Sequence, residues 1–287
     1  LSSGFKYQYG WEIGDAGAYI IIGVLTAIFT LAVYTGLEKG IKWIGNLNTW
    51  IFIAVWFFVL VFGPTLFLIN LTTNSIGQYL AEFLPMSLYT GPDVAGDWLG
   101  GWTIFYWAWW ISWSPFVALF IARISKGRSI RQTVAATLIL PTLADFLWYG
   151  VIGGAGIRFD VTGVLQEHGL ESAVFAIADH LPLTGLLAVV LIFLIATFFL
   201  TSANSAALAL SMFVSGKETP GRNLRTFWGI ALGAVAAVLA GTGSLKVIQT
   251  ASIATAFPLM FLLVLVVYGT FRGLRQYRAE LNEEFES

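Results

Sequence analysis

Seven apolar runs, each nearly free of charged residues, constrain what this chain can fold into more than any other feature. A helix of about 20 apolar residues crosses the hydrocarbon core of a bilayer. The runs cover residues 16–37, 47–71, 102–122, 133–156, 183–214, 226–241 and 247–271. A barrel would instead show short alternating segments between turns, and no such period occurs. The sequence therefore predicts an all-α integral membrane protein with seven transmembrane helices.

The composition excludes several function classes. Hydrophobic residues make up 57% of the chain and charged residues 11%, against about a quarter charged in soluble domains. A net charge of −1 does not suit a nucleic-acid partner, and the absence of cysteine excludes thiolate chemistry. We expect no metal site at His168 or His180, because neither has a partner at ligand spacing. The spans hold no paired carboxylates and no nucleophile–base pair, so we expect no enzyme.

The distribution of basic residues predicts the orientation of the helices. Lys and Arg concentrate in short cytoplasmic loops. Twelve of the 15 basic residues fall in alternate connections, at Lys39, Lys42, Arg123, Lys126, Arg128, Arg131, Lys217, Arg222, Arg225, Arg272, Arg275 and Arg278. We therefore expect a multi-pass protein of the cell membrane with its first residue outside and its last residue inside.

Two outer connections have apolar residues at helical spacing. Residues 74–89 and 172–181 are predicted as short helices on the membrane surface, which cap the bundle or form a lid. Gly153–Gly156 lacks the pattern of a dinucleotide-binding turn and is interpreted as a loop. The chain begins at Leu1 rather than Met, so we expect a piece of a longer protein.

Tryptophan is concentrated in the third run. Six of the 12 tryptophans lie between Trp98 and Trp113. On a helix one arc holds seven rings, with Trp110 and Trp107 to one side and behind: Trp102, Phe105, Tyr106, Trp109, Trp113, Phe116 and Phe120. An interfacial aromatic belt does not account for tryptophans near the middle of a span. They either fill a helix interface or form a cage that binds a methylated cation by cation–π attraction.

A polar face crosses the fifth run. Thr197, Thr201, Asn204 and Ser205 share one side of an apolar helix, with Ser202 beside them. Such residues pack helices together in membranes. Alternatively, their hydroxyls and nearby carbonyls form a neutral oxygen site for a hard monovalent cation such as Na⁺.

Asp145 is the only acid within a predicted span. An ionisable residue inside the membrane suggests a function, and proton coupling is one candidate. Capping of a broken helix or a place in a wet cavity is the alternative, because Pro141 lies four residues before Asp145.

Residues 101–131 begin with the segment from Trp102 to Phe116 and end with the segment from Phe120 to Arg131, and they resemble the signature of the betaine/carnitine/choline transporter family. Gly63-Pro64-Thr65, Thr201-Ser202-Ala203 and Gln249–Ser252 support the resemblance. It implies a fold of twelve helices with two inverted five-helix repeats (LeuT-like), of which this chain resembles the last seven helices. We expect residues 1–101 to hold two helices that end the first repeat plus the outer amphipathic segment, 102–271 to form the second repeat, and 272–287 to form a short cytoplasmic tail.

The resemblance also implies functional residues. Trp109, Trp110, Trp113 and Phe120 would line the substrate route. Phe198, through its carbonyl, Thr201 and Ser202 match the family's sodium site, and Phe116 matches part of a second one. Val117 stands where sodium-independent members have Met, whereas Asn204 replaces the family's usual Asp.

The resemblance thus implies a sodium symporter that imports glycine betaine, choline or a similar quaternary ammonium solute for osmoprotection. Alternating access, Na⁺ as coupling ion without any cofactor, and a homotrimer are part of this expectation. The alternatives are a proton-coupled choline porter, a sodium-independent quaternary-amine exchanger, and a receptor that binds the cation without moving it.

Overall fold

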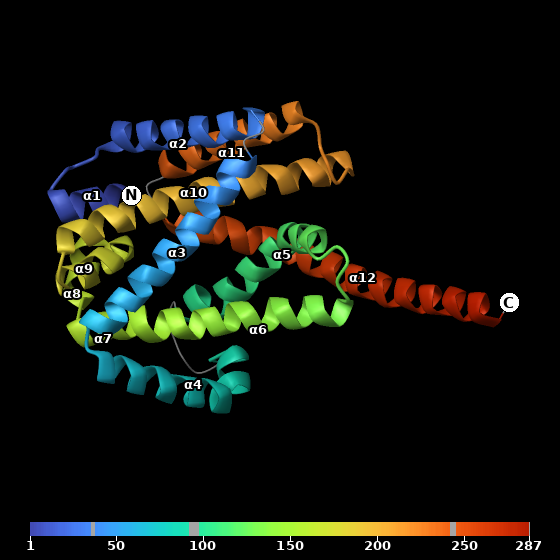
Figure 1. Cartoon of the computed structure of the whole chain (residues 1–287), viewed down its shortest axis with the longest axis horizontal. Helices are drawn as coiled ribbons and strands as arrows, with labels where there is room; N and C mark the ends of the chain where they lie inside the picture. The colour runs from blue at the N-terminus through green and yellow to red at the C-terminus, as the bar shows by residue number, and fades with distance from the viewer. Residues whose placement is uncertain (36–37, 92–97, 242–244, 287) are drawn as a thin grey trace. The chain divides into compact units, whose positions relative to one another are not determined.

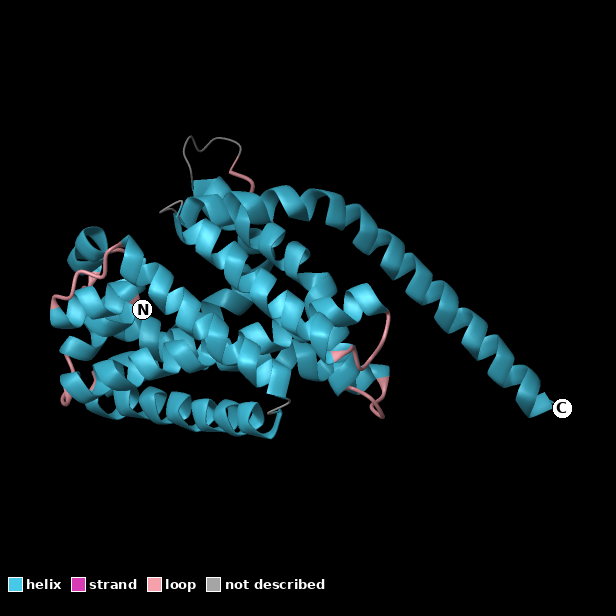
Figure 2. Cartoon of the chain, turned by 90° about the horizontal axis from the view of Figure 1, so that it is seen from above, coloured by secondary structure: helices cyan, strands magenta, loops and turns pink. Residues whose placement is uncertain are grey.

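The computed structural model describes residues 1–35, 38–91, 98–241 and 245–286, and within these ranges the chain forms helices and loops and no strand (Figure 2). The α-helices are α1 (Ser2–Tyr9), α2 (Asp15–Thr35), α3 (Glu38–Phe62), α4 (Thr65–Ser87), α5 (Phe105–Ile124), α6 (Ile130–Trp148), α7 (Gly154–Phe159), α8 (Thr162–His168), α9 (Ala173–Asp179), α10 (Thr184–Ser215), α11 (Arg222–Gly241) and α12 (Leu245–Glu286). Two π-helical turns, η1 (Gly100–Ile104) and η2 (Tyr149–Gly153), precede α5 and α7, and a 3₁₀ turn, η3 (Leu170–Ser172), precedes α9.

The described residues include seven helical segments that are long and apolar enough to cross a membrane. They are Ala16–Thr35, Lys42–Phe62, Gly100–Ile124, Ile130–Phe159, Thr184–Ser215, Arg222–Gly241 and Gln249–Glu280. The seven predicted spans are thereby confirmed, and the chain is a multi-pass membrane protein. The last helix continues through the predicted tail as far as Glu286.

The second span is shorter than the apolar run that predicted it. Helix α3 ends at Phe62, and the chain bends at Gly63 and Pro64 before α4 begins. Pro64 has no backbone N–H and so cannot continue the hydrogen-bond ladder of α3. The Thr65 hydroxyl instead donates to the Leu60 carbonyl at 2.8 Å. The prediction that this span reaches residue 71 is therefore wrong.

The predicted surface segments are helical. Helix α4 covers residues 74–87 of the first segment and begins nine residues before it, at Thr65. The second segment contains α9, and α8 precedes it in the same connection.

The chain divides into two compact units, which are described separately. Unit 1 contains Leu1–Phe83 and Arg123–Gly241, and unit 2 contains Leu84–Ala122 and Thr242–Ser287. The domain bounds expected from the sequence, at residues 101 and 271, stay a prediction.

Helix α10 is the centre of unit 1. It packs against α2, α3 and α11 (Figure 1). The core of this unit joins α3, η2, α7, α9 and the N-terminal half of α10, and Phe175 and Ala188 are fully enclosed in it. In α1, Gly4 lies directly against the Phe175 ring, where a side chain would have no room.

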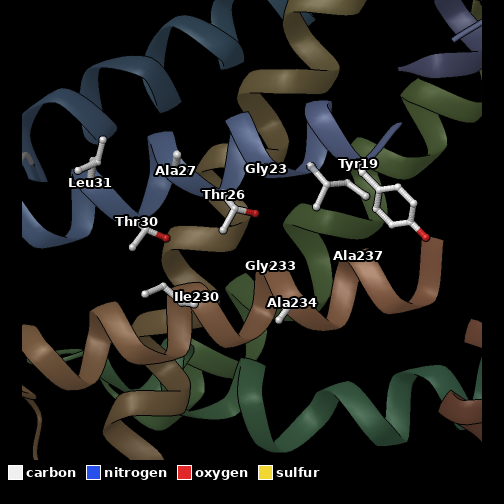
Figure 3. A pocket seen from close by; sticks show the side chains of 11 residues that line it. Tyr19, Gly23, Thr26, Ala27, Thr30, Leu31, Ile230, Gly233, Ala234 and Ala237 are labelled. Atoms are coloured by element: carbon white, nitrogen blue, oxygen red, sulfur yellow. The ribbon is translucent and has the colours of Figure 1, made fainter. Parts of the chain in front are cut away.

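Helices α2 and α11 approach closely because small residues line their contact (Figure 3). Gly233 of α11 faces Thr26 of α2, and Gly229 faces Thr30. A Cβ atom on Gly233 would overlap the Thr26 side chain. Small residues at a spacing of four let helix backbones approach in lipid. An apolar groove of about 610 Å³ runs beside this contact.

The turn between α6 and α7 is held from two sides. Trp56 of α3 donates its indole N–H to the Leu147 carbonyl at 2.8 Å, and Gly150 lies against Thr72 of α4. Gly153 and Gly154 are helical, so the interpretation of Gly153–Gly156 as a loop is wrong. A Cβ atom on Gly154 would lie 3.1 Å from Leu68 and from Leu71 of α4, which shows that this glycine permits close packing rather than a turn.

Candidate functional site

Helix α5 carries the aromatic residues and contains a proline in its middle. Pro115 leaves the carbonyl of Ile111 without its usual N–H donor. The Ser114 hydroxyl donates to this carbonyl at 2.8 Å, and Ser112 donates to the Trp109 carbonyl at 2.8 Å. The two serines therefore provide local hydrogen bonds where the proline removes a backbone donor, beside the tryptophans.

The rings on η1 and α5 form two separate groups within unit 2. Trp102 stacks on Tyr106 with ring centroids 5.8 Å apart, and Tyr106 and Phe105 each contact Trp109, at 5.9 and 5.3 Å. One turn further, Trp113 contacts Phe116 at 6.0 Å. The predicted aromatic arc is thus present as a ladder of rings followed by a pair.

The predicted substrate residues are exposed within unit 2. Trp109, Trp110, Trp113 and Phe120 have exposed fractions of 43%, 65%, 51% and 39%. Among the described residues, Trp110 makes no ring contact, and Trp110 and Trp113 do not pack on each other. Packing within unit 2 therefore leaves part of each of these four rings exposed. The assignment of the four residues to the substrate route stays a prediction.

Trp107 has a structural role on the same helix. Its indole N–H donates to the Ser87 carbonyl at 3.0 Å, which ties the end of α4 to α5 within unit 2. The six tryptophans of this region therefore do not all belong to one surface.

The polar face of α10 lies in unit 1. The Thr201 hydroxyl is 2.9 Å from the Phe198 carbonyl and 3.1 Å from the Thr197 carbonyl, and Ser205 donates to the Thr201 carbonyl at 3.1 Å. Residues 197–205 of α10 therefore gather two hydroxyls and three carbonyls.

Phe198, Thr201 and Ser202 lie within one turn of α10, residues 198–202, whereas Phe116 lies on α5 in unit 2. The Ser202 hydroxyl is exposed, and it donates to no acceptor within the described part of the chain. The Asn204 side-chain oxygen is buried and has no hydrogen-bond partner among the described residues. The assignment of these residues to sodium sites stays a prediction.

Asn48 of α3 is a buried polar residue that the sequence interpretation missed. Its side chain has no exposed surface, and its amide contacts the Thr197 hydroxyl at 2.7 Å. An asparagine within an apolar run was the available signal, because amides inside a membrane span need partners.

Asp145 is exposed on α6, four residues before the π-helical turn. The turn agrees with the irregular helix expected near this acid. A role of Asp145 in proton coupling stays a prediction.

Residues 1–279 match the model of the betaine/carnitine/choline family transporters. The chain belongs to this family. The resemblance inferred from the tryptophan-rich segment is confirmed, and so is the expectation that the chain is part of a transporter and not of an enzyme.

Similar proteins are named as transporters of glycine betaine or ectoine. A probable glycine betaine transporter of Desulfitobacterium hafniense is 39% identical over 96% of this chain, and the glycine betaine transporter OpuD of Bacillus subtilis is 36% identical over 99% of it. An ectoine/hydroxyectoine transporter of Virgibacillus pantothenticus is 36% identical over 93%. The matches cover 57%, 56% and 54% of these proteins, so the chain spans about half of their length.

Proposed function

We propose that the protein to which this chain belongs imports glycine betaine or a similar quaternary ammonium solute by sodium symport. The observation that carries this proposal is the exposed aromatic surface of α5. Trp109, Trp110 and Trp113 present indole rings on a helix without a carboxylate. A quaternary ammonium group has no N–H to satisfy, and indole faces attract it by cation–π interaction.

The coupling ion is proposed to bind at the polar turn of α10. The Phe198 carbonyl and the hydroxyls of Thr201 and Ser202 are neutral oxygen ligands, which suit Na⁺. These three oxygens are fewer than a hard cation needs, so the other ligands must come from elsewhere in the full-length protein. Phe116 is proposed to belong to a second ion site.

Alternating access is proposed to follow from movement of one repeat against the other around a site at mid-membrane depth. In this arrangement the first residue of the chain lies outside and the last lies in the cytoplasm, in agreement with the distribution of Lys and Arg. A homotrimer is the assembly that the family resemblance suggests.

An uptake panel tests the proposal. The full-length protein is expressed in cells without their own compatible-solute uptake, and labelled betaine, choline, carnitine and proline are offered with Na⁺ or K⁺. We expect uptake of one of the first three solutes, and only with Na⁺. Exclusive uptake of proline would contradict the aromatic site, and equal uptake in K⁺ would contradict sodium coupling.

A proton-coupled choline porter is the second candidate. The observation that favours it is Asp145, a carboxylate exposed on a membrane-spanning helix. Uptake that persists without Na⁺, depends on external pH and disappears in Asp145→Asn would select this alternative.

A further inference from the structure

Asn48 and Thr197 form a buried polar pair between α3 and α10. Asn48 has no exposed surface and Thr197 is 7% exposed. Both residues lie within membrane-spanning helices, where no water competes for their hydrogen bonds. The Asn48 Nδ2 atom is buried and has no hydrogen-bond partner among the described residues.

The proton count at Thr197 bears on the orientation of this amide, and either orientation leaves one of its two polar atoms without a partner among the described residues. The Thr197 hydroxyl oxygen lies 2.7 Å from the Asn48 amide and 2.7 Å from the Phe193 carbonyl. A hydroxyl has one proton and cannot donate to both. If the amide turns so that its N–H₂ group donates to Thr197, the hydroxyl can donate to Phe193. The Asn48 carbonyl oxygen is then the buried group without a partner.

Asn48 acts on the turn that carries the proposed cation ligands. Thr197 is one helical turn before Thr201, and its carbonyl lies 3.1 Å from the Thr201 hydroxyl. Phe198, the next residue, supplies the carbonyl at 2.9 Å from the same hydroxyl. The contact with Asn48 therefore holds the turn from which the proposed cation ligands project.

A second contact from α3 reaches the same turn. Phe52, four residues after Asn48, contacts the Phe198 ring edge to face, with centroids 6.1 Å apart and ring planes at 90°. Residues four apart lie on one face of a helix. Asn48 and Phe52 thus hold Thr197 and Phe198 at two adjacent points, which fixes the rotation of α10 against α3.

We propose that Asn48 is a positioning residue for the cation site, which sets the affinity for Na⁺ by fixing the α10 turn through Thr197. This inference rests on the proposed sodium site at Phe198, Thr201 and Ser202. The competing explanation is that the pair only packs two helices together, because amides and hydroxyls commonly bridge helices in membranes. The two roles predict different results when both partners are replaced.

The test uses the full-length protein in proteoliposomes and measures the Na⁺ concentration for half-maximal betaine uptake together with the thermal unfolding midpoint. The variants are Asn48→Leu, Thr197→Val and their combination. Asn46→Leu is the matched control, because Asn46 is an exposed asparagine two residues earlier on α3. Thr197→Ser keeps the hydroxyl and is the conservative variant.

We expect Asn48→Leu and Thr197→Val each to raise the half-maximal Na⁺ concentration about tenfold, the scale of losing support behind a metal ligand. Asn46→Leu and Thr197→Ser should stay near the wild-type value. The double variant should regain thermal stability, because no buried polar group is left unpaired. Its half-maximal Na⁺ concentration should nevertheless remain raised.

A double variant with wild-type sodium dependence would overturn the positioning role, and so would single variants that lower the unfolding midpoint alone. If the single variants do not fold, the double variant decides by itself. Sodium-independent uptake by the wild type would refute the proposed function, and the inference with it. Sodium-dependent uptake that Asn48→Leu leaves unchanged would refute the inference alone.

Discussion

Trp56 of α3 donates its indole N–H to the carbonyl of Leu147, at a distance of 2.8 Å, where α6 passes into a π-helical turn. A π-helical turn contains an extra residue and disturbs the regular ladder of hydrogen bonds. The indole supplies a donor at this point. Trp148, the next residue, stacks on Phe52 of α3 with ring centroids 4.2 Å apart. Helix α3 therefore supports both α10 and the irregular end of α6.

Trp56→Phe removes this donor and keeps an aromatic ring. We expect the variant to lose about 1 kcal/mol of stability, the usual scale of one hydrogen bond. The thermal unfolding midpoint of the full-length protein measures the effect. Trp50→Phe is the control, because Trp50 is 70% exposed on the same helix and should tolerate the change. Equal midpoints for the two variants would show that the Leu147 carbonyl does not need the indole.

Gly150 and Gly153 lie in the same π-helical turn but have different surroundings. A Cβ atom on Gly150 would overlap Thr72 of α4, whereas one on Gly153 would meet nothing within 4 Å. We expect Gly150→Ala to destabilise the protein by about 1–3 kcal/mol, as overpacking does, and Gly153→Ala to be nearly neutral. Adding Thr72→Ala to Gly150→Ala should restore part of the loss. If Thr72→Ala gives no such rescue in a thermal unfolding series, the close contact between η2 and α4 is refuted.

Unit 1 contains an ionisable pair outside the membrane spans. The Tyr7 hydroxyl donates to the Asp179 carboxylate at 2.7 Å. Burial, together with this hydrogen bond and the carboxylate charge, raises the pKa of Tyr7 from 10 to about 12. Folding therefore favours the neutral phenol, and this contribution to stability is complete below pH 10 and is lost as the pH rises toward 12.

We expect Tyr7→Phe to cost roughly 0.5–1 kcal/mol at neutral pH, the scale of an ordinary hydrogen bond rather than of one to a buried charge, because the Asp179 carboxylate is exposed. A double-mutant cycle with Asp179→Asn, read from unfolding midpoints, isolates the interaction. Tyr9→Phe changes an exposed tyrosine of the same region and serves as the control. Strictly additive effects of the two substitutions would show that Tyr7 and Asp179 do not interact.

The exposed tryptophans of α5 give a prediction for substrate binding. We expect Trp110→Ala and Trp113→Ala to abolish betaine uptake by the full-length protein, because each removes an indole face worth on the order of 2 kcal/mol to a desolvated cation. Substitution by Phe should retain part of the uptake. Trp43→Ala, which removes an exposed tryptophan of α3, is the control. Near-normal uptake by the two alanine variants would contradict the aromatic cage.

The membrane spans were predictable because an apolar run of bilayer length has few other solutions. Gly63 and Pro64 are residues that commonly end a helix. Apolar residues lie on both sides of them, however, and the two apolar segments were interpreted as one span. The segment Gly153–Gly156 was wrongly interpreted as a loop, because a glycine that permits a close helix contact, as Gly154 does, has the same letter as one in a turn. Only the neighbouring α4 distinguishes the two.

The candidate sites were predictable to different degrees. The hydroxyls of α10 are close in sequence, so helix geometry places Thr197 and Thr201 on one face. The pairing of Asn48 with Thr197 joins residues far apart in the chain, and a single sequence does not reveal which buried groups meet. The ladder of rings from Trp102 to Trp109 follows the expected arc, whereas the hydrogen bond from Trp107 to Ser87 depends on how the end of α4 packs.

The central claim is that Na⁺ bound at the α10 turn drives solute import, and transport by purified full-length protein tests it most directly. Proteoliposomes with an inward Na⁺ gradient receive labelled glycine betaine, and the wild type is compared with Thr201→Ala/Ser202→Ala. We predict that the wild type concentrates betaine above the external level. The double variant should need about tenfold more Na⁺, equivalent to about 1.4 kcal/mol of lost ion binding. Equal accumulation without a Na⁺ gradient, or an unchanged Na⁺ requirement in the double variant, would contradict the account.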